Sequence, residues 1–479
     1  MQDLMRTISQ AGAATDIVLQ SGAKAVSRLE LLLAVEGLAK QLRILNVKSV
    51  ALYADNGIDW ILTDFACRVL GIRIVPVPLF FSAAQIKHTI SSSGATALIS
   101  DQQNVENLIC ATVGQPFCGM TSLYTLEASE PVALPEGTQK ITFTSGTTGS
   151  PKGVCLSAEQ QAAVATAIAA AASKDNPKHL CVLPLSTLLE NLAGVYAPLL
   201  SGGSVNAPSL ADVGLAGSSG LDIKQFLHCI TEHQPNTMIL VPEMLNALTE
   251  ATECGWRPPS SLHFVAVGGG KVSPELLRRA RAAGLPAYEG YGLSECASVV
   301  TLNVPGADHI GSVGQPLPHV SVQIEQGEIV VRGSEFLGYA GQPDSWNAAP
   351  LRTGDLGHID DDGFVFVSGR AKNQLISSFG RNISPEWVES ELLAGSLLQQ
   401  VVVIGDARPY CVALVEPRNA ATTDADIDAW MRSANQKLPD YARVVDWHRV
   451  TAPQRATIES DYSVEIEEMY ATKAEASNQ

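Results

Sequence analysis

The chain contains one stretch whose residue types suit phosphate, Ile141 to Val154, which reads ITFTSGTTGSPKGV. Glycine permits close approaches that a Cβ blocks, and successive N–H groups in such a loop form a concave anion site. Hydroxyl groups come from Thr144, Ser145, Thr147 and Thr148, glycines from Gly146, Gly149 and Gly153, and a positive charge from Lys152. The stretch is therefore a candidate phosphate cradle, with a flexible surface loop as the alternative.

Two later segments could contact a nucleotide base and its metal ion. Gly268, Gly269 and Gly270 follow an apolar run, which suggests backbone packed against a flat ligand or, alternatively, a tight turn. In Tyr291-Gly-Leu-Ser-Glu295 the aromatic ring could stack on a base, and Glu295 is a hard oxygen ligand suited to Mg²⁺. Taken alone, the pentapeptide is a weak signal, and a surface tyrosine and glutamate are the default interpretation.

Two further candidates follow. Asp355, in Thr353-Gly-Asp355, could accept hydrogen bonds from both hydroxyls of a ribose, or could simply belong to a turn. The stretch from Ser368 to Glu389 reads SGRAKNQLISSFGRNISPEWVE and contains Arg370 and Lys372. It also fits an interdomain linker that enters a helix at Ser384-Pro385, with proline in the first helical position.

These motifs, in this order, resemble those of the adenylate-forming (AMP-binding) superfamily, which includes acyl-CoA synthetases, luciferases and peptide-synthetase adenylation domains. TSGTTGSPKG is similar to its phosphate loop, and YGLSE is similar to its YGxTE motif, with Ser294 in place of Thr. The resemblance covers residues 141 to 389, and the segment from Arg370 onward resembles the family's hinge and the glycine loop beyond it.

The resemblance implies a role for each motif. Lys152 and the loop would hold the β- and γ-phosphates of ATP, Glu295 would hold Mg²⁺, and Asp355 and Arg370 would fix the ribose. Lys372 matches the hinge of a mobile terminal domain. Nucleotide contacts are expected from Thr144, Ser145, Gly146, Thr147, Thr148, Gly149, Lys152, Gly269, Gly270, Tyr291, Gly292, Ser294, Asp355 and Arg370, with Gly380 approaching a pantetheine thiol.

The implied reaction is a two-step ligation. A carboxylate attacks the α-phosphate of ATP, pyrophosphate leaves, and a thiol then displaces AMP from the acyl-adenylate. Pro184 to Leu192, PLSTLLENL, lacks the Asp with which amino-acid-activating relatives bind an α-amino group. The acyl-CoA synthetase-like branch is most similar, which implies a fatty acid, with an aryl acid as the alternative. The thiol partner is coenzyme A or the phosphopantetheine of an acyl carrier protein.

The chain departs from the family pattern near its C-terminus. The family places a catalytic lysine in a glycine-containing loop there, but no residue after Gly405 is glycine, Lys437 lies too early and Lys473 too late. Arg455 is the basic residue nearest the expected place, so it is the candidate catalytic cation beside Lys152, Glu295 and Lys372. The alternatives are slow adenylation or a non-catalytic nucleotide- or acyl-binding relative.

The elements that position these residues follow an α/β pattern. Apolar runs of strand type alternate with helical patterns, for example Val50 to Tyr53, Ile58 to Leu70 and Ala95 to Ser100. Short alternating strands after about residue 310 indicate a small β-rich subdomain. We expect two α/β sheet subdomains plus this β-rich part in residues 1–369, and a small mobile α/β domain in residues 370–479.

Composition bounds the function. The 479 residues exceed one ordinary core, and the net charge of −17 argues against nucleic-acid partners and a polybasic membrane surface. The nine cysteines show no CxxC and no His/Cys cluster, which predicts a reducing, cytoplasmic location and no zinc site. We expect no signal peptide and no transmembrane segment.

Overall fold

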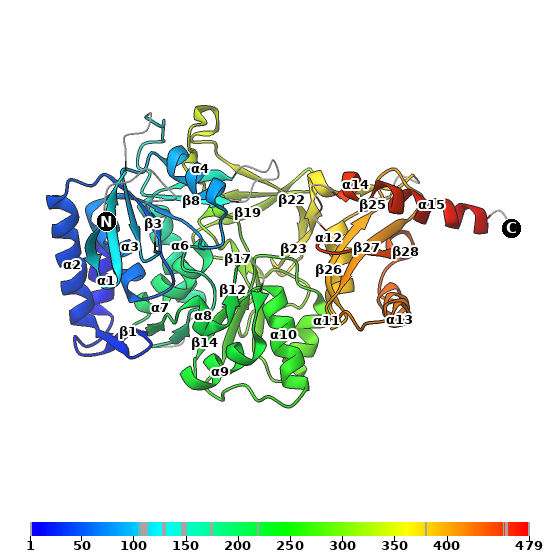
Figure 1. Cartoon of the computed structure of the whole chain (residues 1–479), viewed down its shortest axis with the longest axis horizontal. Helices are drawn as coiled ribbons and strands as arrows, with labels where there is room; N and C mark the ends of the chain where they lie inside the picture. Colours follow the sequence, from blue (N-terminus) through cyan, green and yellow to red (C-terminus); the bar gives the residue numbers. More distant parts are fainter. Residues whose placement is uncertain are drawn as a thin grey trace.

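The computed structural model describes residues 2–103, 105, 114–126, 131–144, 151–172, 176–217, 220–378, 381–453, 455 and 458–477. In Figure 1 the chain runs from the two large sheets, blue to green, through a yellow β-rich part to an orange and red terminal unit at the right. The α/β class predicted from the sequence is confirmed. Within the described residues, no helix is both long and apolar enough to cross a membrane.

The first large sheet has eight strands in the order β21-β9-β8-β4-β3-β5-β7-β6. Its strands are β3 (Ser49–Tyr53), β4 (Arg73–Pro76), β5 (Ala97–Ser100), β6 (Gln115–Cys118), β7 (Thr121–Thr125), β8 (Lys140–Thr144), β9 (Lys152–Leu156) and β21 (Gly338–Tyr339). Helices α2 (Arg28–Ile44), α3 (Ile58–Leu70) and α4 (Ala83–Ser93) accompany it. Strands β8 and β9 are antiparallel, with Thr144 opposite Lys152, so the phosphate-loop segment joins two neighbouring strands.

The second large sheet has nine strands in the order β18-β17-β16-β15-β14-β10-β11-β1-β2. Its strands are β1 (Ile17–Ser21), β2 (Lys24–Ser27), β10 (Lys178–Leu180), β11 (Ser204–Asn206), β14 (Thr237–Leu240), β15 (Phe264–Val267), β16 (Ala287–Tyr291), β17 (Thr301–Leu302) and β18 (Gln315–Pro316). The run from β1 through β11, β10, β14 and β15 to β16 is parallel, so the carboxyl ends of these strands meet at one edge.

Helices flank this second sheet and complete its core. They are α1 (Gln2–Gln10), α6 (Ala158–Ala172), a π-helix (Glu190–Tyr196) that continues into α7 (Ala197–Leu200), α8 (Leu210–Val213), α9 (Ile223–His233), α10 (Pro242–Glu253) and α11 (Pro274–Ala282). A small hairpin of β12 (Leu215–Ala216) and β13 (Gly220–Leu221) lies between α8 and α9 in the chain.

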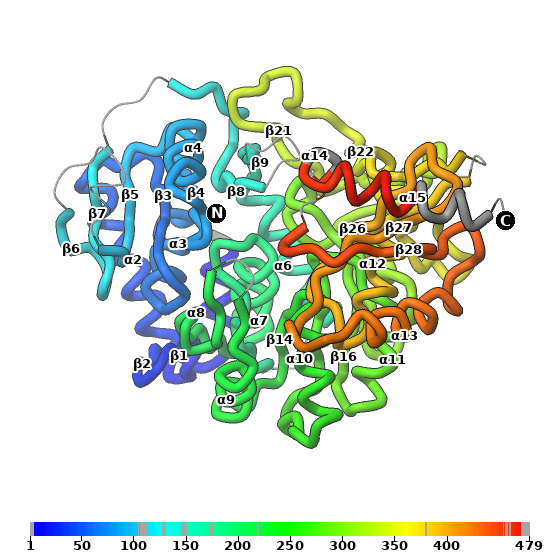
Figure 2. Tube along the Cα trace, turned by 45° about the vertical axis from the view of Figure 1, so that its right-hand side comes forward, coloured from blue at the N-terminus to red at the C-terminus, as the bar shows by residue number. Residues whose placement is uncertain are grey.

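A four-stranded antiparallel sheet and a terminal unit complete the chain. The sheet contains β19 (Ser321–Glu325), β20 (Glu328–Arg332), β22 (Leu351–Ile359) and β23 (Val365–Arg370). The terminal unit contains β24 (Leu375–Ile376), β25 (Asn382–Ile383), α12 (Pro385–Leu393), β26 (Leu398–Ile404), β27 (Cys411–Pro417), α13 (Asp424–Asn435), β28 (Val444–Arg449), α14 (Ile458–Asp461) and α15 (Ser463–Ser477). It has its own core, which includes Val388, Leu392 and Val403, and Figure 2 shows it in front of α11 and β16.

Most elements expected from the sequence are present with small boundary differences. Helix α12 begins as predicted, with Ser384 as its N-cap and Pro385 first. The alternative of a turn at Thr353-Gly-Asp355 is wrong, because these residues lie inside β22.

Candidate active site

An apolar cavity of about 220 Å³ lies against the second large sheet. Helix α6, the π-helix and α7 contribute Ile168, Ala193 and Pro198 to its wall, and β15 contributes Ala266. At one end it is lined by Gly268 and Gly269 and by the segment from Gly290 to Ser294, which follow the carboxyl ends of β15 and β16. Two of the predicted motifs thus form the mouth of a pocket that suits an apolar ligand.

Two positions at this mouth require glycine, each for a different physical reason. Gly269 has φ +83°, a left-handed conformation that favours glycine. At Gly292 a Cβ would lie 1.5 Å from the Ser298 carbonyl oxygen, so this position is glycine because two backbone segments touch. Ser298 itself has φ +98°, which is unusual for a residue with a side chain. The YGLSE turn is therefore held in one tightly defined shape.

Tyr291, Asp355 and Arg370 form a group beside this mouth. The Tyr291 hydroxyl donates to Asp355 Oδ2 at 2.6 Å, and Arg370 Nε donates to Oδ1 at 2.9 Å. Asp355 is buried, whereas the Arg370 side chain is 48% exposed. Burial, followed by the Asp355 charge, raises the pKa of the Tyr291 phenol well above its usual value, so it remains a donor. Each Asp355 oxygen keeps a lone pair for a further donor.

Lys152 and Glu295 meet through a residue that the sequence motifs did not indicate, Tyr339. Its hydroxyl donates to Glu295 Oε1 at 2.8 Å, and Lys152 Nζ lies 5.3 Å from the centre of its ring. Burial raises the pKa of the Tyr339 phenol well above its usual value, and the Glu295 charge adds to that rise. Tyr339 is paired with Val154 on β9, so it belongs to the strand edge that carries Lys152. A cation, a carboxylate and a phenol therefore converge where the phosphate-loop segment ends.

Not every predicted site residue can be placed. Ser145, Gly146, Thr147, Thr148, Gly149 and Gly380 lie outside the described residues. Thr144 ends β8 opposite Lys152, and Gly270, directly after Gly269, does not line the cavity. Lys372 is exposed in a short turn directly after β23, between the β-rich sheet and α12.

Arg455 is paired with residues of the terminal unit. Its Nη2 forms an ion pair with Glu389 Oε1, and Nη1 donates to the Val403 carbonyl oxygen at 3.2 Å. Glu389 Oε1 also accepts from the Val403 N–H at 2.7 Å. Burial raises the pKa of Glu389 to about 7 although Arg455 opposes the rise. The three residues connect α12, β26 and the segment before α14.

Lys271 connects the glycine turn to the β-rich sheet. Its Nζ donates to the Val367 carbonyl oxygen on β23 at 2.5 Å. Burial lowers the pKa of Lys271, and burial raises the pKa of Glu289 on β16 to about 8, with Lys271 opposing that rise. The contact therefore fixes the distance between the cavity mouth and the strand that carries Arg370.

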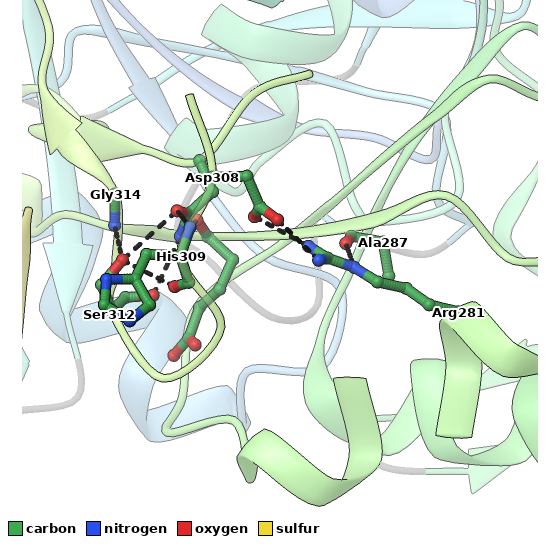
Figure 3. A network of polar contacts seen from close by, with 8 residues as sticks. Arg281, Ala287, Asp308, His309, Ser312 and Gly314 are labelled. Atoms are coloured by element: carbon green, nitrogen blue, oxygen red, sulfur yellow. Dashed lines mark hydrogen bonds and ion pairs between the residues drawn. The ribbon is translucent and has the colours of Figure 1, made fainter. Parts of the chain in front are cut away.

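A polar network connects helix α11, strand β16 and the 303–314 loop (Figure 3). Arg281 donates to both Asp308 oxygens, at 2.6 and 2.8 Å, and to the Ala287 carbonyl oxygen at 2.9 Å. The Asn303 amide donates to the carbonyl oxygens of Glu289 and Ser312, at 3.0 and 2.9 Å. The bidentate Arg281–Asp308 pair and the hydrogen bond from Asn303 to Glu289 thus hold the 303–314 loop near β16, the strand that carries Tyr291.

The expectation of no His/Cys cluster is wrong, because the fold brings together residues that are separate in the sequence. The ligand atoms of His179, Cys181 and Glu190, all buried, lie within 4.8 Å of one another. His179 Nδ1 is 2.9 Å from Thr237 Oγ1, and Nε2 is 3.0 Å from Glu190 Oε1. Both ring nitrogens are thus engaged in hydrogen bonds. The alternating HLC stretch was the available signal, because residues two apart in a strand share a face.

Comparisons with known proteins agree with this architecture. Residues 8–339 match the family described as AMP-binding enzyme, and residues 372–474 match the AMP-binding enzyme C-terminal domain. A feruloyl-CoA synthase from Amycolatopsis sp is 30% identical over 469 residues, covering 89% of this chain and 91% of that protein. The 2-succinylbenzoate–CoA ligase of Bacillus licheniformis is 29% identical over 387 residues, covering 75% of this chain and 76% of that protein.

A long-chain-fatty-acid–CoA ligase of Mycobacterium tuberculosis is 25% identical over 469 residues, covering 79% of this chain and 76% of that protein. Among solved structures, an anthranilate CoA ligase in complex with anthranoyl-AMP has a TM-score of 0.81 at 18% identity, with 97% of each chain covered. O-succinylbenzoate coenzyme A synthetase from Bacillus subtilis, in complex with ATP and magnesium ion, has a TM-score of 0.72 at 24% identity, covering 95% of this chain and 97% of that one. The chain belongs to the AMP-binding enzyme family, as an acid–thiol ligase.

Proposed function

We propose that the protein activates a carboxylic acid with ATP and transfers the acyl group to a thiol. In the first step an oxygen of the acid attacks the α-phosphorus, an O–P bond forms, and pyrophosphate leaves. In the second step a thiol attacks the carbonyl carbon of the acyl-adenylate, a proton is released from sulfur, and AMP leaves. The thiol is that of coenzyme A or of a carrier-protein phosphopantetheine.

The observation that supports this proposal is the position of the cavity mouth. The apolar cavity opens at Gly268, Gly269 and Tyr291, and Tyr291 donates directly to Asp355. An acid with its apolar part in the cavity would present its carboxyl group beside a nucleotide held by Asp355 and Arg370. Positioning and charge neutralisation account for most of the catalysis in such phosphoryl chemistry.

The described residues fit the roles assigned to them. Asp355 retains two lone pairs for ribose hydroxyls, and Arg370 is exposed enough to meet ribose or phosphate. Glu295, oriented by the Tyr339 hydroxyl, would hold Mg²⁺, whose charge neutralises the phosphates. Lys152 would add a positive charge at the β- and γ-phosphates, together with the loop from Ser145 to Gly149.

The size of the cavity limits the acid. Its volume of about 220 Å³ exceeds the roughly 150 Å³ of a cavity that binds benzene. The distance from Phe264 at the inner end to Gly268 at the mouth is four strand residues, or about 13 Å. We propose an acid of medium size, either a fatty acid of moderate chain length or a single-ring aryl acid, without an α-amino group.

Transfer to the thiol requires a second arrangement of the terminal unit. We propose a domain boundary at residues 369 and 370, with the terminal unit turning about the exposed Lys372. Gly380 would then approach the pantetheine arm. Short segments that connect separately packed cores are the usual hinges.

A second candidate function, binding of nucleotide or acyl-adenylate without efficient adenylation, is favoured by the terminal unit. The chain lacks a Gly-Lys sequence after Gly405. Arg455, the basic residue nearest the place where the family has its lysine, is paired with Glu389. Loss of one charge directed at the transition state typically lowers a rate by about 10²–10³.

ATP–pyrophosphate exchange with a broad panel of fatty and aryl acids separates the two functions. We expect exchange with at least one medium-sized acid, and its loss in Asp355→Ala. Measurable ATP binding without exchange for any acid would exclude the ligase and support the binding protein. Direct assay of acyl-CoA formation, with a phosphopantetheinylated carrier protein in parallel, then identifies the acceptor.

A further inference from the structure

The inner end of the cavity is polar, although its walls are apolar. His179, Thr237 and Phe264 line it from three neighbouring strands, β10, β14 and β15. They form one row across the parallel sheet, because His179 pairs with Thr237 and Thr237 pairs with Phe264. The row lies at the amino ends of these strands, whereas the glycine mouth lies at their carboxyl ends. It is therefore the part of the pocket farthest from the nucleotide groups.

We call the row of His179, Thr237 and Phe264 the floor of the cavity. Its polar residues belong to a chain of hydrogen bonds that runs from Glu190 through His179 to Thr237. Glu190 Oε1 faces His179 Nε2 at 3.0 Å, and His179 Nδ1 faces Thr237 Oγ1 at 2.9 Å. A carboxylate has no proton to give, so Nε2 donates to Glu190 and, in the neutral ring, Nδ1 accepts from the threonine. The single proton of the Thr237 hydroxyl is then committed to His179. With the His179 ring in this neutral tautomer, Thr237 acts as an acceptor toward the cavity.

The backbone is shaped to hold this chain. Glu190 begins the π-helix, and Gly194 lies opposite it, where a Cβ would come within 2.5 Å of Glu190 Oε1 and 2.8 Å of His179 Nε2. Glycine at 194 therefore makes room for the pair, and π-helical turns occur frequently at functional sites. Glu190 and His179 are both almost completely buried, and burying such groups is unfavourable unless they are paired. A floor that had only to be apolar would contain neither residue.

We propose that the acid substrate carries a hydrogen-bond donor, a hydroxyl or an amino group, at the end remote from its carboxyl group, and that Thr237 accepts this hydrogen bond. His179 and Glu190 are positioning residues that orient the Thr237 hydroxyl. The inference rests on the proposed function, since it requires the cavity to hold the acid. It narrows the substrate to acids with an apolar middle and a polar far end.

The test compares matched acids with the wild-type protein. Cinnamate, 4-hydroxycinnamate, 4-aminocinnamate and 4-methoxycinnamate form one set, and octanoate with 8-hydroxyoctanoate forms another. In ATP–pyrophosphate exchange we expect kcat/KM for the donor-bearing acid to exceed that of its unsubstituted partner by about 10- to 100-fold in at least one set. The methoxy compound, which can only accept, should gain nothing over cinnamate.

Two variants at the inner end of the cavity and one control variant locate the effect. Thr237→Val removes the hydroxyl with little change in shape, and we expect the preference for the donor-bearing acid to fall to about onefold. Thr249→Val is the matched control, because Thr249 is also buried but donates to Leu245 in α10, away from the cavity. It should keep the wild-type preference. His179→Leu should reduce the preference mainly through KM, as expected for a group that orients the acceptor.

The outcomes separate the two proposals. Exchange with unsubstituted acids that equals or exceeds that with donor-bearing ones overturns the polar floor and leaves the ligase intact. A preference for the methoxy compound also overturns it, since it reverses the direction of the hydrogen bonds. Absence of exchange with every acid overturns the proposed function and this inference with it. The wild-type comparison is decisive even if a variant does not fold.

Discussion

The role of Arg455 is open to a direct test, because its partner is a buried carboxylate whose pKa is shifted. The Glu389 pKa of about 7, against an ordinary 4.5, means that ionising Glu389 in the folded protein costs about 3 kcal/mol of stability above pH 7. Below pH 4.5 the group is protonated in both states, so this loss is absent; it accumulates as pH rises to 7.

Arg455→Ala removes the charge that holds this pKa down, so the Glu389 pKa should rise further. At about pH 6 most of Glu389 is already protonated, and the variant loses mainly the contact with Val403, worth about 1 kcal/mol. At about pH 8.5 the wild type keeps an ion pair that the variant lacks, and the loss should grow by about 1–3 kcal/mol. Urea unfolding at the two pH values measures the difference.

The matched control is Arg449→Ala in the same unit. Arg449 is 35% exposed and Arg455 34%, but Asp424, the partner of Arg449, is 74% exposed. We expect a loss below about 1 kcal/mol, nearly equal at both pH values. Both variants should retain ATP–pyrophosphate exchange. A decrease of about 100-fold in exchange for Arg455→Ala alone, with equal stability loss at both pH values, would refute the reasoning and place the guanidinium on the phosphates.

Three further predictions concern the site. Gly292→Ala should destabilise the protein by about 3 kcal/mol or more in urea unfolding, because its Cβ would overlap the neighbouring carbonyl oxygen at 1.5 Å, whereas Gly37→Ala in α2, where a Cβ meets nothing within 4 Å, should stabilise by about 0.5–1 kcal/mol. Tyr339→Phe removes the 2.8 Å hydrogen bond to Glu295 and should raise the Mg²⁺ concentration needed for half-maximal exchange roughly tenfold; an unchanged requirement would exclude Glu295 as an oriented ligand. Asp355→Asn should raise KM for ATP about 10- to 100-fold, and 2′-deoxy-ATP should lose less affinity in the variant than in the wild type if the carboxylate binds ribose.

Local sequence accounts for much of the fold. The predicted helix from Ile58 to Leu70 has the observed bounds, because Gly71 supplies the left-handed residue that ends it. The buried strands of both large sheets read as short apolar runs, as expected for parallel strands covered on both faces. Short edge strands such as β21 gave no such signal, since they carry only two residues each.

Site residues that belong to sequence motifs could be predicted. Contacts that depend on how two strands align could not. Tyr291 lies 64 residues before Asp355, and these two residues and Arg370 were grouped by resemblance to a family rather than by local pattern. The contact of His179 with Thr237 depends on how β10 aligns with β14, which is set by packing of the whole sheet. The pairing of Arg455 with Glu389 bridges 66 residues and has no local signal either.

The position along the strands at which the cavity ends would set the length of the acid that it can hold. Phe264 and Ala266 on β15, followed by Gly268 directly after the strand, line the cavity, and each step of two residues changes depth by about 6.6 Å. A large side chain at Ala266 would close the pocket at half its length, while a small one at Phe264 would extend it. Selectivity for acid length can therefore change in discrete increments at one end of the strands, while the residues proposed to bind ATP near the other end stay unchanged.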